Sequence, residues 1–145
     1  MMEAQSFVNA KVVEIARGWI GTPYHHQASL KLVGCDCLGL VRGIWREIHG
    51  EEPEALPAYS SDWGQVSKEE TLINAAKRHL APCDLDTITP GKVLVFRMRP
   101  KAIAKHCGVV SAPGRMIHAL EGIGVCEMTL DAFWQRQAVA CFGFR

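Results

Sequence analysis

The stretch Gly34-Cys35-Asp36-Cys37-Leu38-Gly39-Leu40-Val41 constrains the fold most, because a turn changes there into a strongly patterned helix. Counted from Cys37, apolar residues recur with the spacing of one stripe along an α-helix, at Leu40, Val41, Ile44, Trp45 and Ile48. Gly50 marks the end of this helix. A cysteine in the first turn lies among unpaired backbone N–H groups, where the helix dipole favours negative charge. The pattern therefore predicts a stabilised, nucleophilic thiolate at Cys37.

Two histidines downstream are candidates for the base that would activate this thiol. His106 and His118 each lie in a predicted strand, and Ser111-Ala112-Pro113-Gly114 between them has the composition of a turn. A three-residue loop from Ser111 to Pro113 would place His106 directly opposite His118 on one face of an antiparallel hairpin. A slip of one residue would separate them. In the even register, one imidazole takes the thiol proton and the other orients it, as in a cysteine hydrolase.

Two further helices are predicted. The first runs from Ser6, as its cap, to Ile20; its predicted inward residues include Phe7, Ala10, Val13 and Ile20. The second starts at a capping box, Ser67-Lys68-Glu69-Glu70, and ends near His79, with Leu72, Ala75, Ala76 and Leu80 inward. Residues 51–65 read as a long loop that contains Tyr59 and Trp63, which either wall a cleft or pin the loop to the core.

The second half of the chain is predicted to be mostly strands. Besides the two histidine strands, strands are expected over Val93 to Phe96, Val125 to Met128 and Ala138 to Phe144, with a short helix capped by Thr129. Helices followed by antiparallel strands predict an α+β fold in which helices pack on one sheet and Cys37 projects over it.

Length and composition predict a single domain over residues 1–145, because 145 residues with 48% apolar content suit one core. A net charge of +1 gives no sign of nucleic-acid binding. No apolar run reaches the length of a membrane span, so membrane insertion is not expected. The opening Met1-Met2-Glu3-Ala4-Gln5 does not have the organisation of a secretory signal, and synthesis in the cytoplasm is therefore expected.

The six cysteines, at positions 35, 37, 83, 107, 126 and 141, are expected to be free thiols in a chain made in the cytoplasm. Cys35 and Cys37 are one residue apart, and no second Cys or His pair has zinc-finger spacing, so no metal site is predicted. Cys107, Cys126 and Cys141 read as small buried residues. Cys35 remains an alternative to Cys37 as the reactive thiol.

Several motifs together resemble the NlpC-type cell-wall peptidases, papain-like cysteine enzymes that cleave peptidoglycan stem peptides. They are Gly21-Thr22-Pro23-Tyr24, Asp36-Cys37-Leu38-Gly39-Leu40-Val41, Pro90-Gly91, His106-Cys107-Gly108-Val109 and Ile117-His118-Ala119, in the family's order. The resemblance implies that Cys37 is the nucleophile, His106 the general base, His118 the third polar residue and Tyr24 an oxyanion donor. It implies no cofactor. Asp36 is predicted to hold the turn or the helix start instead of joining the triad.

The resemblance is strongest to the stand-alone copies in phage-tail and gene-transfer-agent gene clusters. It implies cleavage of the bond between D-glutamate and the diamino acid, on a phage-like tail tip whose tail-tip or baseplate proteins carry the enzyme to the bacterial cell wall. The same thiol chemistry on another amide, or acyl transfer, stays open, as does a structural tail-tip component with vestigial activity. Three departures alter the groove walls: Leu38 replaces serine, Lys92 replaces aspartate, and His25-His26-Gln27 replaces a Trp-Gly-Gly-like run.

Overall fold

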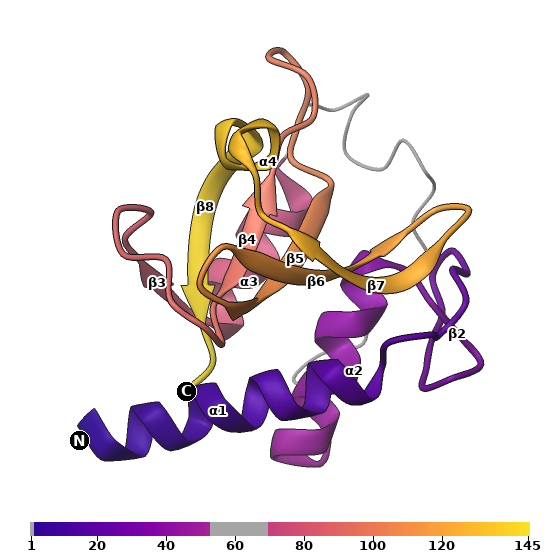
Figure 1. Cartoon of the computed structure of the whole chain (residues 1–145), viewed down its shortest axis with the longest axis vertical. Coiled ribbons are helices and arrows are strands. Elements are labelled where there is room, and N and C mark those ends of the chain that lie inside the picture. Colours follow the sequence, from indigo (N-terminus) through magenta and orange to yellow (C-terminus); the bar gives the residue numbers. More distant parts are fainter. Residues whose placement is uncertain (1, 53–69) are drawn as a thin grey trace.

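A computed structural model describes residues 2–52 and 70–145 (Figure 1). The predicted Tyr59 and Trp63, and most of the predicted capping box, lie outside these residues. In chain order the elements are α1 (Met2–Gly18), β1 (Ser29–Leu30), β2 (Gly34–Cys35), α2 (Cys37–His49), α3 (Thr71–His79), β3 (Ala81–Cys83), β4 (Val93–Phe96), β5 (His106–Ala112), β6 (Arg115–Leu120), β7 (Gly124–Thr129), α4 (Ala132–Gln137) and β8 (Ala138–Gly143).

The centre of the fold is an antiparallel sheet with strand order β3-β8-β4-β5-β6-β7, accompanied by the two-stranded ribbon β1-β2. Helices α1, α2 and α3 pack on one face, over inward residues such as Val93, Val109 and Ile117. The other face carries a smaller apolar cluster that includes Phe96 and the α4 residue Trp134. Figure 1 shows α1 and α4 at opposite ends of the sheet. The predicted α+β class is confirmed, and both faces of the sheet are covered.

Helix α1 buries a different stripe from the predicted one. Its buried side chains are Val12, Ile15, Ala16 and Trp19, whereas Phe7 is 73% exposed and Ile20 is 39% exposed. Both sets fit a helical period, so spacing alone did not separate them. The helix also begins at Met2 and ends at Gly18, so the predicted cap at Ser6 is wrong.

Helix α2 matches its prediction closely. It runs from Cys37 to His49, and Gly50 ends it with φ of 90° while its N–H donates to Arg46 at 2.8 Å. Leu40 and Ile44 are fully buried. On the flank that faces α1, a Cβ at Gly43 would lie 2.1 Å from the buried Trp19 ring. The small residue therefore sets how closely α1 and α2 approach.

Helix α3 ends at His79 as predicted, but its start is built differently. Glu70 occupies the N-cap position, and its side chain makes no capping hydrogen bond. The carboxylate instead accepts hydrogen bonds from Arg97 at 2.6 Å and from the Ala104 N–H at 2.9 Å. Glu70 therefore ties the start of α3 to the loop before β5. After α3, residues Ala81–Cys83 form β3, an edge strand that the sequence analysis missed.

The histidine hairpin has a tighter turn than predicted. Ala112 pairs with Arg115 across Pro113 and Gly114, and a register irregularity follows before Val110 pairs with Met116. Continued along the strands, this register places Gly108 opposite His118, so the predicted pairing of His106 directly opposite His118 is wrong. The offset is two residues. Both histidines therefore still share one face of the sheet, as diagonal neighbours.

The remaining strands largely follow the sequence pattern. β4 has the predicted bounds, and β7 and β8 lie within one residue of theirs at each end. The short helix α4 is capped by Asp131, which accepts the Trp134 N–H at 3.2 Å, so the predicted cap at Thr129 is wrong. Among the described residues, no helix has the length and apolar character to cross a membrane.

We expect Gly43→Ala to lower the free energy of unfolding by roughly 1–3 kcal/mol, because the new methyl group overlaps Trp19. Urea unfolding monitored by tryptophan fluorescence and circular dichroism measures it. The double variant Trp19→Phe/Gly43→Ala is the control, since the smaller ring makes room for the methyl group. A combined loss equal to the sum of the two single losses would contradict the contact.

Candidate active site

Asp36 fixes the start of helix α2. Its Oδ1 accepts the Gly39 N–H at 2.7 Å and its Oδ2 accepts the Gln27 N–H at 2.7 Å. The side chain is only 3% exposed. The first bond is an N-cap, and the second ties the helix start to the loop after Tyr24. The predicted role of Asp36 at the helix start is confirmed, and the cap orients Cys37 at the end of the helix.

Strand β5 holds Cys37 from both sides of His106. The Cys37 thiol lies 3.5 Å from the carbonyl oxygen of Lys105 and donates to it, and the Cys107 thiol donates to the carbonyl oxygen of Cys37 at 3.4 Å. The His106 side chain is near enough to Cys37 to lower the pKa of its thiol. Two residues that flank the candidate base thus contact the candidate nucleophile.

The pKa of Cys37 is held well below the usual value for a thiol. The largest cause is the neighbouring Cys107 thiol, followed among the lowering effects by His106. Burial and the nearby Asp36 carboxylate act in the opposite direction. Cys107 in turn has a pKa raised well above the usual value, by the neighbouring Cys37 and by burial. Of the two thiols, Cys37 is therefore the one that loses its proton more readily.

His106 and His118 form a hydrogen-bonded pair. The distance between His106 Nε2 and His118 Nδ1 is 2.8 Å, so the two rings meet diagonally across the hairpin. Gly108 stands opposite His118, where a Cβ would lie 3.1 Å from the Cβ of His118. His118 is fully buried, and burial, followed by the charge of His106, lowers its pKa to about 3. His118 is therefore neutral at neutral pH.

Tyr24 lies beside this group, next to Cys35 through an isolated parallel bridge. Burial is the first cause that raises the pKa of Tyr24 to about 12, followed by the charges of Cys37 and Asp36. The phenol therefore keeps its proton at neutral pH and remains a hydrogen-bond donor.

Cys35, the alternative reactive thiol, is a poor nucleophile in this fold. It is fully buried, and burial raises its pKa to about 12. The other four histidines do not join the group, and His26 lies 3.8 Å from Asp36 on the outer side of the loop. Of the predicted site residues, the structure brings together Cys37, His106, His118 and Tyr24.

Sequence reasoning missed two residues that contact this group. Cys107 was read as a small buried residue, although strand alternation, with His106 on the opposite face, directs it toward the helix layer. Trp134 packs on both imidazoles, with ring centroids 5.6 Å from His106 and 5.0 Å from His118. A position in a short helix far along the chain gave no signal for this contact.

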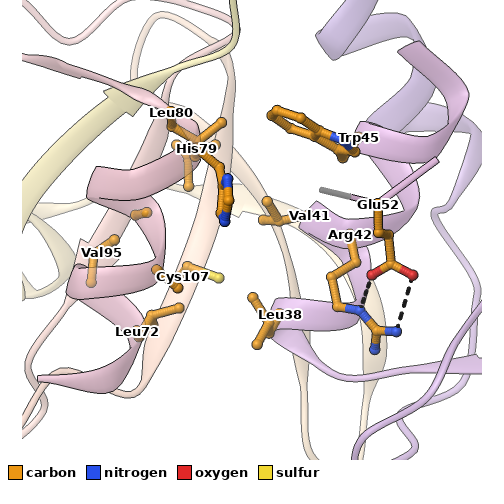
Figure 2. Close-up of a pocket in the computed structure, with 13 residues that line it drawn as sticks. Leu38, Val41, Arg42, Trp45, Glu52, Leu72, His79, Leu80, Val95 and Cys107 are labelled. Atoms are coloured by element: carbon orange, nitrogen blue, oxygen red, sulfur yellow. Dashed lines mark hydrogen bonds and ion pairs between the residues drawn. The ribbon is translucent and has the colours of Figure 1, made fainter. Parts of the chain in front are cut away.

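An apolar cavity of about 90 Å³ lies behind the nucleophile, between α2, α3 and the sheet (Figure 2). Leu38 and Cys107, the chain neighbours of Cys37 and His106, are part of its wall, and the ion pair of Arg42 and Glu52 stands at one side. Neither Cys37 nor the two histidines line it. In the described part of the chain, no three His, Cys, Asp or Glu side chains are arranged to hold a metal ion.

The match to a known family covers most of this fold and includes every residue of the group. The model of the NlpC/P60 family matches residues 21–142. This chain belongs to the NlpC/P60 family. The members of that family are cell-wall hydrolases of the cysteine peptidase or amidase type, so the resemblance of the sequence motifs is confirmed at this level. No curated protein sequence matches the chain significantly.

Solved structures of NlpC/P60 proteins have the same fold. The NlpC/P60 domain of the peptidoglycan hydrolase SagA has 18% identity and a TM-score of 0.66, over 94% of this chain and 98% of that one. An NlpC/P60 protein from Bacillus cereus also has 18% identity and a TM-score of 0.64, but the match spans 39% of its length. NlpC2 from Trichomonas vaginalis has 15% identity and a TM-score of 0.67, over 46% of its length. At these identities the likeness establishes the papain-like fold.

We expect Cys107→Ala to slow alkylation of Cys37 by iodoacetamide roughly tenfold at pH 6, because a hydrogen bond to a charged group contributes about 1.5–3 kcal/mol and its loss raises the pKa of Cys37. Rates are measured from pH 5 to 9 with peptide mapping, which separates Cys37 from Cys35. Cys107→Ser keeps a donor and is the matched control, with a profile near that of the wild type. Identical profiles for the alanine variant and the wild type would exclude Cys107 as the donor.

Proposed function

We propose that this NlpC/P60 domain is a cysteine peptidase that hydrolyses peptidoglycan stem peptides, with Cys37 as nucleophile and His106 as base. The observation that carries the proposal is the pair of His106 and His118, whose ring nitrogens lie 2.8 Å apart, next to a Cys37 thiol whose pKa His106 lowers. A buried structural cysteine needs neither partner. The arrangement supplies a nucleophile, a base and an orienter in sequence.

The reaction begins with the Cys37 thiolate, whose sulfur attacks the carbonyl carbon of a substrate amide. His106, protonated on both ring nitrogens at that stage, gives one proton to the departing amine, and the carbon–nitrogen bond breaks to leave an acyl-enzyme. Neutral His106 then takes a proton from water, and the resulting hydroxide releases the acid and the Cys37 thiolate. Throughout, His118 Nδ1 accepts the His106 Nε2–H, and this hydrogen bond fixes the orientation of the His106 ring.

The tetrahedral oxyanion needs donors near Cys37. The pKa of the Tyr24 phenol is raised to about 12, so the phenol keeps its proton at neutral pH and can donate a hydrogen bond. In the first turn of α2, Asp36 takes the N–H groups of Gly39 and Leu40, through its side chain and its carbonyl oxygen respectively. The N–H of Cys37 itself is therefore the backbone donor that we assign to the oxyanion, beside the Tyr24 hydroxyl.

For the substrate, we propose the bond between D-glutamate and the diamino acid of the stem peptide, on the basis of the family motifs. The nearest alternatives are the muramoyl-alanine amide and acyl transfer to another amine, which use the same thiol chemistry. Each leaves a different new amine or a new amide. Mass spectrometry of digested muropeptides therefore distinguishes the three.

We expect Cys37→Ala to abolish hydrolysis, and His106→Ala to lower kcat/KM by roughly 10² to 10⁴ or more, since both remove a reacting group. His118→Asn should retain more activity than His106→Ala, because an amide oxygen still accepts the imidazole N–H. Cys35→Ala is the matched control and should stay near the wild-type rate. Muropeptide release is the assay. Wild-type rates in His106→Ala would refute the assigned base, and an inactive wild type would favour a structural tail component.

We also propose that the domain acts at the bacterial cell wall as part of a phage-like tail tip, after synthesis in the cytoplasm. The support for this is the resemblance of its motif set to the stand-alone peptidases of phage tails and gene transfer agents. A partner on the particle would then supply the local concentration at the wall. Tail-tip or baseplate proteins are the partners that this placement requires.

On this proposal, the isolated domain should cleave soluble muropeptides yet bind intact sacculi weakly, because the partner and not the domain holds it at the wall. A sacculus pull-down of the Cys37→Ala variant measures binding without digestion. The proteome of purified particles should contain the chain together with tail-tip proteins. Tight binding of the free domain and its absence from particles would point instead to a released lysis enzyme.

A further inference from the structure

The two catalytic candidates on β5 and β6 lie under the helix α4, on the sheet face away from α1 and α2. Trp134 of α4 contacts His118 with ring centroids 5.0 Å apart and the planes at 86°, and His106 at 5.6 Å and 36°. Phe96 completes the group, 5.7 Å from His106 and 5.3 Å from Trp134. Two imidazoles are thus enclosed by two large aromatic rings, one of which is supplied by a short helix near the chain's end.

The protons of the histidine pair can be counted. When Cys37 is a thiolate and His106 an imidazolium, both nitrogens of His106 carry hydrogen, and its Nε2–H must donate to His118 Nδ1 across 2.8 Å. His118 therefore has to keep Nδ1 bare, with its single proton on Nε2. A second proton on His118, at Nδ1, would place two N–H donors face to face and break the hydrogen bond between His118 and His106.

The surroundings of His118 keep that second proton away. The residue is fully buried, and its Nε2 has no hydrogen-bond partner among the described residues. The titratable groups that face it are His106 on β5 and Cys126, directly opposite on β7. Glu127, the next residue on β7, points to the other face, where it pairs with Arg17 and Arg115. In the part of the chain that the structure describes, no carboxylate contacts His118 to stabilise an imidazolium.

Trp134 is the outer layer over this ring. It is itself half-buried, so water lies on its far side, and the Asp131 cap fixes its backbone at 3.2 Å. We propose that Trp134 is a positioning residue that excludes water from His118, so that His118 stays neutral and keeps accepting the His106 Nε2–H. This role rests on the proposed cysteine peptidase function, and it adds to Cys37, His106, His118 and Tyr24 a residue that acts without contact with the substrate.

The inference predicts a pH effect. Removal of the indole admits water to His118 and raises its pKa from about 3 toward the ordinary histidine value of about 6.5. Because activity needs the neutral ring, it is lost as the pH falls through the new pKa. A ring with a pKa near 6.5 is about 10% neutral at pH 5.5, so kcat/KM of Trp134→Leu should fall roughly tenfold relative to the wild type at pH 5.5 and stay within about twofold at pH 8.

The closing experiment follows His118 directly. Histidine ring ¹⁵N signals are titrated by NMR in the full chain, with His118→Asn used to assign them. His118 should not titrate between pH 5 and 8 in the wild type and should do so in Trp134→Leu, while Trp134→Phe gives a smaller shift in the same direction. Phe133→Leu is the matched control, because that exposed ring on the same helix packs on Trp134, whereas the ring contacts of the two histidines among the described residues are with Phe96, Trp134 and each other.

The outcomes separate this inference from the proposed function. An unchanged His118 titration in folded Trp134→Leu, or a loss of activity that is equal at every pH, would overturn the role of Trp134. If Trp134→Leu does not fold, the direction of the shift in Trp134→Phe decides the question. The NMR titration needs no substrate. A wild type without activity on muropeptides would therefore overturn the proposed function, whereas the titration would still test whether Trp134 excludes water from His118.

Discussion

The contact between the first residue of α2 and the first residues of β5 is the constraint on which the site depends. Lys105 and Cys107, on either side of His106, each make a hydrogen bond with Cys37. A strand cannot move His106 without moving both neighbours. The nucleophile is consequently fixed relative to its base by main-chain and thiol contacts, and Asp36 fixes the same helix end from the opposite side.

The two faces of the sheet hold different parts of the site. Cys107 points to the face covered by α1 and α2, where it reaches Cys37 and stabilises the thiolate. His106 and His118 lie on the other face, under Trp134. Cys37 and the neutral His118 are thus held in different surroundings, and His106 at the start of β5 lies between them in the chain of contacts.

The accuracy of the sequence analysis followed the kind of physical signal available. The α2 stripe, Gly50 and the apolar run of β4 are local patterns, and the structure reproduces them. The face of α1 was predicted wrongly because two stripes fit the helical period, and only Gly43 on another helix favours the one that ends in Trp19. The capping residues of α3 and α4 were misplaced by similar competition, since Glu70 is engaged by Arg97 and Asp131 lies closer to the helix than Thr129.

The sequence by itself determined the order of the main helices and strands and the family, because a cysteine at a helix start, two strand histidines and the motif Gly21-Thr22-Pro23-Tyr24 are recognisable one by one. Whether the two histidines share a face was left open by the sequence, since it depends on the parity of the register. The register itself and the enclosure of the pair were decided by tertiary structure. A two-residue turn and the register irregularity beside it place His118 opposite Gly108, and Trp134 covers His118 from a helix that only the packed sheet positions. Such contacts join residues far apart in the chain, and their energies exist only once the core has formed.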